Sequence, residues 1–201
     1  MTIGPRAERN TAAIQPQSMP ISWTLVILLE DLNYQDSLNN IIKQLFPSYV
    51  LSWNDTIASI VVNDDPVFQL KLEKLHTSAF FDLNILLSIL IVPTFNKIFI
   101  KYLKKLKYEV LTAYEIFSRL SHNKETKKDA DTIKELIGED NINTIRAYLK
   151  CNINANAAAE ELFLHKNSYA YRIKKFTNET TYDYNDFNTL LFLKLILTIT
   201  N

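Results

Sequence analysis

The sequence is poor in glycine, with two in 201 residues, and it has a single cysteine, Cys151. Glycine-rich loops that hold nucleotide phosphates need several glycines close together, so a nucleotide site of this kind is not expected. One cysteine allows neither an intramolecular disulfide nor a metal site with several cysteine ligands, and it suits a cytoplasmic protein. We expect Cys151 to be a small buried apolar residue.

An excess of charge of either sign is also lacking. The 22 basic and 22 acidic residues cancel, so any attraction to nucleic acid must come from a local cluster of basic residues. The longest apolar run, residues 83–93, is shorter than the ~20 residues that span a bilayer. We expect a buried helix or strand there, and no membrane partner. Residues 1–20 lack the apolar segment of a secretory signal and predict a disordered leader.

Motifs of common enzyme classes are absent as well. The sequence contains no GxSxG, P-loop, GxGxxG, HExxH or CxxC pattern, and these patterns position nucleophiles, phosphates or metals. The three histidines, His76, His122 and His165, are widely separated in the sequence, which disfavours a metal site. We therefore expect no enzymatic activity, no cofactor and no metal.

The first half of the chain contains strand and helix patterns. Residues 23–29 and 57–62 are apolar runs that end at polar or acidic residues, and both predict buried strands. Between them, residues 36–46 have apolar side chains at helical spacing. Residues 49–53 are expected to pair with 57–62 as a hairpin.

Apolar residues then recur every three or four positions from Phe95 to Leu120, which predicts one long helix or two stacked helices. The polar face of this segment carries four lysines, at positions 101, 104, 105 and 107. They could form a nucleic-acid patch. A solvated helix face is the favoured interpretation, because no aromatic residues alternate with them.

The charged segment that follows, residues 121–131, lacks apolar anchors and predicts a linker, with at most a short helix before Gly138. The expected organisation is a leader (1–20), an α/β and helical sensor or dimerisation region (21–120), a linker (121–140) and a C-terminal domain (141–201). The expected fold class is α+β and mainly helical: a small N-terminal α/β region and a long helix, followed by a C-terminal helical bundle.

Three short helical patterns are packed closely after Ile142. They cover residues 142–149, 157–162 and 166–177, and alanines in the second would let another helix approach closely. The third helix is expected to turn Ala170, Ile173 and Phe176 inward. Two helices joined by a tight turn form the helix-turn-helix unit, which presents its latter helix to the major groove of DNA.

Basic charge gathers in the same unit. Between Thr144 and Phe176 there are six basic and two acidic residues, a local net charge of +4. Contacts to phosphate need such a local excess. Four of the six basic residues lie on the third helix; the full set is Arg146, Lys150, Lys166, Arg172, Lys174 and Lys175.

The string NANAAAEELFLHKNSYAYRIKKF at residues 154–176 resembles the C-terminal helix-turn-helix of the PucR family of bacterial regulators, related to the sugar-diacid regulator type. The His-Lys-Asn-Ser and Tyr-Arg-Ile blocks carry the resemblance. Lys166 stands where the family usually has arginine, and Ala158 where it usually has threonine. The flanks also match, since TIRAYLKCN resembles the first helix of the family domain and residues 187–199 its closing helix.

The resemblance implies a DNA-binding transcriptional regulator that inserts the helix 166–177 into the major groove. Its expected partners are double-stranded DNA, a second copy of the chain, and a small-molecule effector that the sequence does not identify. A homodimer is expected because one helix reads too few bases. Its candidate surfaces are the long helix and residues 190–199. The alternative is a protein-interaction or ligand-sensing module whose helix-turn-helix no longer binds DNA.

The residues expected to contact DNA lie at the N-terminal end of the third helix and along one of its faces. His165 and Asn167 could instead cap the helix, and Tyr171 is expected to pack against the protein. The expected DNA-binding set is His165, Lys166, Asn167, Ser168, Tyr169, Arg172 and Lys175.

Overall fold

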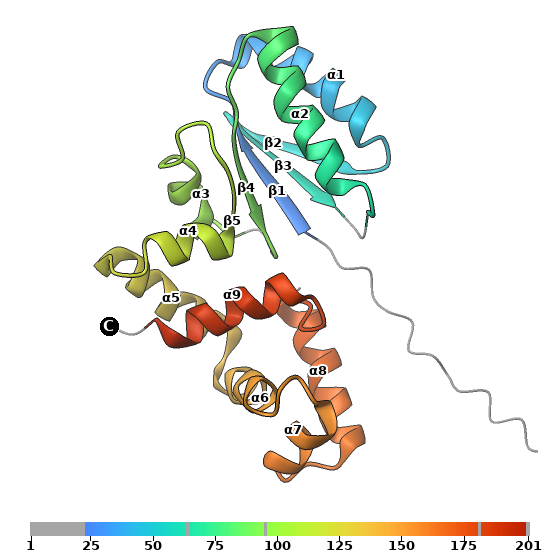
Figure 1. Cartoon of the computed structure of the whole chain (residues 1–201), viewed down its shortest axis with the longest axis vertical. Helices are drawn as coiled ribbons and strands as arrows, with labels where there is room; N and C mark the ends of the chain where they lie inside the picture. Colours follow the sequence, from blue (N-terminus) through green and yellow to red (C-terminus); the bar gives the residue numbers. More distant parts are fainter. Residues whose placement is uncertain (1–22, 63–64, 95, 181, 200–201) are drawn as a thin grey trace, which may run out of the picture.

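The computed structural model describes residues 23–62, 65–94, 96–180 and 182–199. The leader expected at residues 1–20 lies outside these residues. The fold is α+β and mainly helical (Figure 1). In chain order the described elements are β1 (Trp23–Leu28), η1 (Leu32–Tyr34), α1 (Gln35–Leu45), β2 (Val50–Asn54), β3 (Ile57–Val62), α2 (Phe68–Leu83), β4 (Ser88–Val92), α3 (Ile98–Leu103), β5 (Val110–Thr112), α4 (Ala113–Arg119), α5 (Lys124–Ile137), α6 (Glu139–Lys150), α7 (Ala155–Glu161), α8 (Lys166–Thr180) and α9 (Phe187–Thr198).

The strands form one mixed sheet in the order β2-β3-β1-β4-β5. β1 lies in the middle and pairs antiparallel with both β3 and β4, whereas β4 and β5 are parallel. Both strands expected at 23–29 and 57–62 are confirmed. The expected hairpin is confirmed too, since β2 pairs antiparallel with β3 and places Ser52 opposite Ser59.

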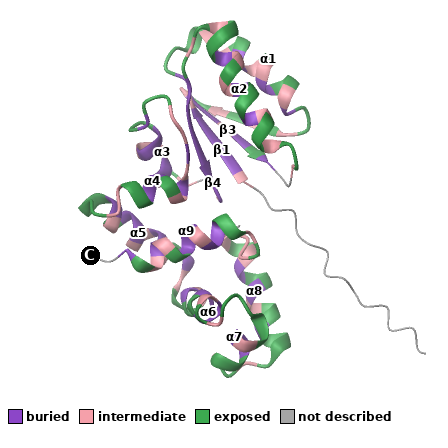
Figure 2. Cartoon of the chain, viewed as in Figure 1, coloured by how far each residue is buried: buried purple, intermediate pink, exposed green. Residues whose placement is uncertain are grey.

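Each face of the sheet is covered by a different set of helices. Because side chains alternate along a strand, Leu25 and Ile27 join α1 and α2 in one core. Val26 and Leu90 point to the other face, where α3 and α4 cover them. The helix expected at 36–46 is confirmed as α1. Figure 2 shows the buried residues concentrated in the strands and on the inner sides of these helices.

The long helix expected from Phe95 to Leu120 is wrong, because the chain forms α3, β5 and α4 there. Val110 pairs with Ile89 of β4, and this pairing with a distant strand leaves no trace in local helical spacing. Thr112 then caps α4, and its hydroxyl accepts the N–H of Glu115 at 3.2 Å. The apolar residues of this pattern are buried in part on two shorter helices, α3 and α4.

Most of the segment expected as a linker forms α5, which packs into the main core through Ala130, Ile133 and Ile137. Polar contacts add to this anchoring. Asp129 is only 7% exposed; it accepts a hydrogen bond from Lys101 Nζ at 2.7 Å and another from the Tyr102 hydroxyl. The charges in this segment therefore attach a helix to α3, whereas the proposed domain boundary at 121–140 stays a prediction.

Two of the four lysines expected on a solvated face form ion pairs with α5. Lys101 lies 3.1 Å from Glu125, and Lys105 lies 2.7 Å from the same carboxylate. Glu125 neutralises part of their charge, and its pKa is lowered by the hydrogen bonds from Lys105 and Lys101. These two lysines serve packing between α3 and α5, which disfavours a nucleic-acid patch on this face.

The apolar run at 83–93 contains β4, whose residues are all buried. No described helix combines the length and apolarity needed to cross a membrane. Among the described residues, no three His, Cys, Asp or Glu side chains gather in a way that could hold a metal ion.

We expect the Asp129→Asn substitution to lower the free energy of unfolding by about 1–2 kcal/mol, because it leaves the half-buried Lys101 ammonium and the buried Tyr102 hydroxyl without their charged acceptor. Urea denaturation measures this loss. Glu125→Gln is the matched control: it removes a solvent-exposed partner of the same lysine and should cost less than about 1 kcal/mol. Equal losses in the two variants would contradict the assigned role of Asp129.

Candidate nucleic-acid interface

The three helices expected after Ile142 are confirmed as α6, α7 and α8, and the closing helix as α9. They enclose a small core of their own. Ala158 and Ala159 of α7 are fully buried against Tyr169 of α8 and Tyr148 of α6. The small side chains let α7 approach α8 closely. Cys151, expected to be buried, lies half-buried at the edge of this core.

Asn154 fixes the beginning of α7. Its side-chain oxygen accepts the backbone N–H groups of Asn156 and Ala157 at 3.0 and 3.1 Å. An asparagine at this position satisfies N–H groups that a helix leaves without partners. The start of the tight helix pair is thereby specified by one side chain.

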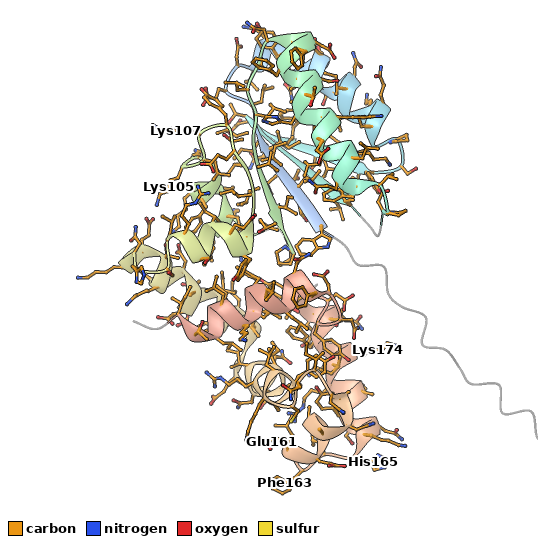
Figure 3. The ribbon with its side chains drawn as sticks, in the orientation of Figure 1. Lys105, Lys107, Glu161, Phe163, His165 and Lys174 are labelled. Carbon is orange, nitrogen blue, oxygen red and sulfur yellow. The ribbon has the colours of Figure 1, made fainter. Side chains whose placement is uncertain are left out.

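The turn between α7 and α8 has the hydrogen bonds of a Schellman motif. The N–H of Phe163 donates to the carbonyl of Glu160 at 3.0 Å, and that of Leu164 to Ala159 at 2.8 Å. Phe163 has a φ of 54°, in the left-handed region that favours glycine. Its side chain is 97% exposed, and Figure 3 shows it with His165 at the tip of the helical half, directed away from the core.

Replacing Phe163 by glycine is expected to raise the free energy of unfolding by up to about 1 kcal/mol, since it relieves a left-handed conformation without losing buried surface. Chemical denaturation is the measurement. Phe163→Ala is the control that keeps the backbone penalty, so its stability should stay near that of the parent protein. A gain as large in the alanine variant would show that the exposed ring, and not the backbone, is responsible.

His165 caps helix α8. Its Nδ1 accepts the backbone N–H of Asn167 at 3.3 Å, and its carbonyl accepts that of Tyr169 at 3.0 Å. The capping interpretation of His165 is therefore confirmed, which leaves the Asn167 side chain available. Lys166, Asn167 and Ser168 are all exposed on the first turn.

The inner face of α8 consists of Tyr169, Ile173 and Phe176, all buried. Two expectations about burial are wrong here: Tyr169, expected on the exposed face, is only 2% exposed, and Ala170, expected to face inward, is exposed. Tyr169, Ile173 and Phe176 are spaced at i, i+4 and i+7, which follows the 3.6-residue helical period. The expected set of Ala170, Ile173 and Phe176 has a spacing of three throughout, which follows that period less well. The large ring of Tyr169 also fills the space left by the two alanines of α7.

The Tyr169 hydroxyl has no hydrogen-bond partner among the described residues. Burial raises the pKa of this hydroxyl above its usual range, with smaller contributions from Tyr184, Tyr148 and Cys151. A neutral hydroxyl without a partner contributes little to the fold. Tyr169 therefore stabilises the fold through the packing of its ring.

The face opposite this core carries Asn167, Tyr171 and Lys174, again at i, i+4 and i+7. Tyr171 is 71% exposed, so the expectation that it packs against the protein is wrong. Lys174 is exposed, and Figure 3 shows it directed outward from α8. Tyr171 and Lys174 were missed as site residues; counting the same spacing outward from Asn167 would have found them.

Arg172 and Lys175 lie on the flank of this outer face. Arg172 Nη1 donates to Thr144 Oγ1 on α6 at 3.3 Å, so the guanidinium is held against the neighbouring helix. Lys175 is more than half exposed and lies 3.7 Å from Glu179. Of the other basic residues, Lys150 is paired with Glu161 at 2.6 Å, which offsets its charge.

The positive charge that remains without a described ion pair on α8 is carried by Lys166 and Lys174, with Arg172 beside them. The arrangement is a helix whose inner face is fixed by three large side chains and whose outer face offers an amide, a phenol and cations. Such groups donate hydrogen bonds to phosphates and to acceptors on base edges.

Much of the two surfaces expected to form a dimer is used within the chain. The long helix does not exist, and α9 is turned into the core of its own chain through Leu190, Phe192, Leu193 and Ile196.

Three comparisons with known proteins were made. Residues 142–199 match the family model of the PucR C-terminal helix-turn-helix domain. The chain is 40% identical over 72 residues to the proline-responsive transcriptional activator PutR of Bacillus subtilis (strain 168); the match covers 35% of this chain and 16% of PutR. A crystal structure of a regulator of polyketide synthase expression from Bifidobacterium adolescentis superposes with a TM-score of 0.39 at 14% identity, covering 92% of this chain and 82% of that one.

Proposed function

We propose that this chain is a cytoplasmic transcriptional regulator that binds double-stranded DNA through α8 as a homodimer, in keeping with the match of residues 142–199 to the PucR C-terminal helix-turn-helix model. The observation that carries the proposal is the exposed row of Asn167, Tyr171 and Lys174. Three buried side chains on the opposite face hold this row in place.

Each group in the row has a partner on DNA. An asparagine amide can bond both the N6 and N7 positions of adenine, and lysine donates to guanine O6 and N7 or to phosphate. A tyrosine hydroxyl donates to phosphate oxygens, which positions a protein on the duplex. Asn167 therefore serves base recognition, while Tyr171 and Lys174 extend contacts along the groove.

Lys166 and Ser168 flank Asn167 on the first turn, near the backbone N–H groups of the helix N-terminus. Phosphate is the natural ligand of such N–H groups. Lysine at position 166 acts as a point charge and cannot form the planar two-bond contact of arginine. We assign Lys166 to a DNA phosphate. Arg172, whose guanidinium is held in place by its hydrogen bond to Thr144, is assigned to the neighbouring part of the DNA backbone.

Removing the charges of Lys166 and Lys174 together is expected to abolish the gel shift of promoter DNA at physiological salt. In titrations at varied salt, the slope of log affinity against log salt should become shallower by about 0.9 for each phosphate that the protein no longer neutralises. A double Lys→Ala variant tests both. Lys124→Ala with Lys128→Ala is the control, because it changes net charge equally on exposed positions of α5.

Unchanged DNA binding in the Lys166 and Lys174 variant would refute α8 as the reading helix. Binding that does not respond to salt would favour the alternative, a protein-interaction or ligand-sensing module, since apolar association releases no counterions.

The two tyrosines of α8 should respond differently to substitution. Tyr171→Ala is expected to weaken DNA binding about fivefold to tenfold, because it removes one exposed hydrogen-bonding group. Tyr169→Phe should leave affinity and stability near those of the parent protein, because the hydroxyl that it removes has no described partner. Fluorescence anisotropy with labelled duplex measures the first effect and urea denaturation the second. A loss of affinity in Tyr169→Phe would show that Tyr169 does reach DNA.

A further inference from the structure

Strand β2 forms one edge of the sheet, with β3 on one side and no described strand on the other. The two-residue turn at 55–56 closes the hairpin with Asn54 opposite Ile57. Hydrogen-bonded and non-bonded pairs alternate along an antiparallel ladder. Counting from the turn, the backbone N–H and C=O groups of Leu51 and Trp53 point to the open side.

This edge carries none of the features that usually prevent strands from pairing. Natural sheets protect their edges with lysine, proline, charges or bulges. The sequence of β2 is VLSWN, with no charge and no proline, and its register with β3 is continuous. Val50 is 76% exposed, and Ser52 and Asn54 are exposed on the same face.

An aromatic groove runs beside the edge, between β2 and the helical segment that precedes it. Its volume is about 600 Å³, and Phe46, Tyr49, Leu51 and Trp53 line it together with Lys43. Existing contacts hold its walls. Trp53 Nε1 donates to Asn39 Oδ1 at 2.7 Å, and the Tyr49 hydroxyl donates to Asp65 Oδ2 at 2.8 Å.

We propose that β2 pairs antiparallel with β2 of a second copy, so that the two sheets become continuous across a two-fold axis at Ser52. This register covers the whole strand and places Leu51 of one copy opposite Trp53 of the other. Both residues have their backbone groups directed outward, so the hydrogen-bonding pattern of the ladder continues. The same side chains then extend the apolar contacts along each groove.

The charges near the ends of the strand agree with this pairing. Asn39 contacts Trp53 near the end of β2. The Phe46 ring contacts the tilted ring of Tyr49 just before the start of β2, so Lys43 of the same helix lies toward the start. In the antiparallel arrangement Asp55 of one copy comes to the start of the other copy's strand. Asp55 of one copy is thereby brought to the end of the strand where Lys43 and Lys71, the latter paired with Asp65, supply positive charge.

The inference deepens the proposed function and rests on it for one point, the need for two reading helices on one operator. A closed two-fold contact uses the same surface on both copies. The edge of β2 is suited to this because it is complementary to itself.

Disulfide trapping tests the register without DNA. In a Cys151→Ser background, Ser52→Cys should cross-link to itself under mild oxidation, because non-bonded antiparallel pairs bring Cα atoms within disulfide range. Val50→Cys alone should cross-link little, while a mixture of Val50→Cys and Asn54→Cys chains should form the mixed disulfide. Cross-linking of Val50→Cys alone, with none in Ser52→Cys, would overturn the register.

Sedimentation velocity then tests the surface itself. The parent protein should be a dimer, and Ser52→Lys should raise the dimer dissociation constant at least about fivefold, because it sets like charges directly opposite each other. Ser52→Glu should do the same, and mixing the two variants should restore dimers. Ser118→Lys, at an exposed serine of α4 away from the β2 edge, is the matched control and should remain dimeric.

A monomeric parent protein, or a dimer that Ser52→Lys leaves unchanged, would overturn the inference. Dimers that trap at Ser52 but fail to shift DNA would leave the β2 interface standing and refute the proposed function instead. The two failures are thus distinguishable.

Discussion

The packing of Phe192 holds the sheet half and the helix-turn-helix half of the chain together. Its ring centre lies 6.0 Å from Phe99 and 5.5 Å from Phe117, which belong to the helices on the sheet. On the other side it stacks near Tyr182 at 6.4 Å, and Tyr182 stacks on Phe176 of α8 at the same distance. A continuous set of aromatic contacts therefore connects the sheet with the C-terminal part of α8.

Helix α9 is central for the same reason. It lies between the sheet half and the α6–α8 helices (Figure 1) and contacts α4, α5 and α6. Most of the apolar surface of this helix is therefore used within its own chain. The outer face of α8, with its exposed polar groups, and the unpaired edge of β2 are surfaces that could bind a partner.

The parts of the fold that local sequence determines were predictable. A buried strand needs only a run of apolar residues, and β1 and β3 have such runs. The helix-turn-helix was predictable because its helices are short, capped and close in sequence. Helix α2 was not, since exposed Leu70, Phe80 and Phe81 obscure the buried face formed by its other apolar residues.

Other features depended on contacts between distant residues. β5 exists because Val110 pairs with Ile89, and α5 is anchored because Asp129 accepts hydrogen bonds from Lys101 and Tyr102. Neither contact is visible in periodicity. For the site, the spacing predicted α8 and the burial of Ile173 and Phe176. It put Ala170 on the inner face in place of Tyr169, and the exposed Tyr171 was expected to pack against the protein.

Residues 124–137 form helix α5 where a flexible linker was expected. In the proposed DNA complex, this helix affects which operators the protein would bind. A reading helix on a loose tether tolerates variable distances between half-sites. Here, α5 and the aromatic contacts of α9 leave α8 little freedom to shift, so the distance between two copies of α8 would be set by the protein alone. An operator one base pair too short or too long would have to twist or bend to bind, and its own stiffness would then contribute to selection.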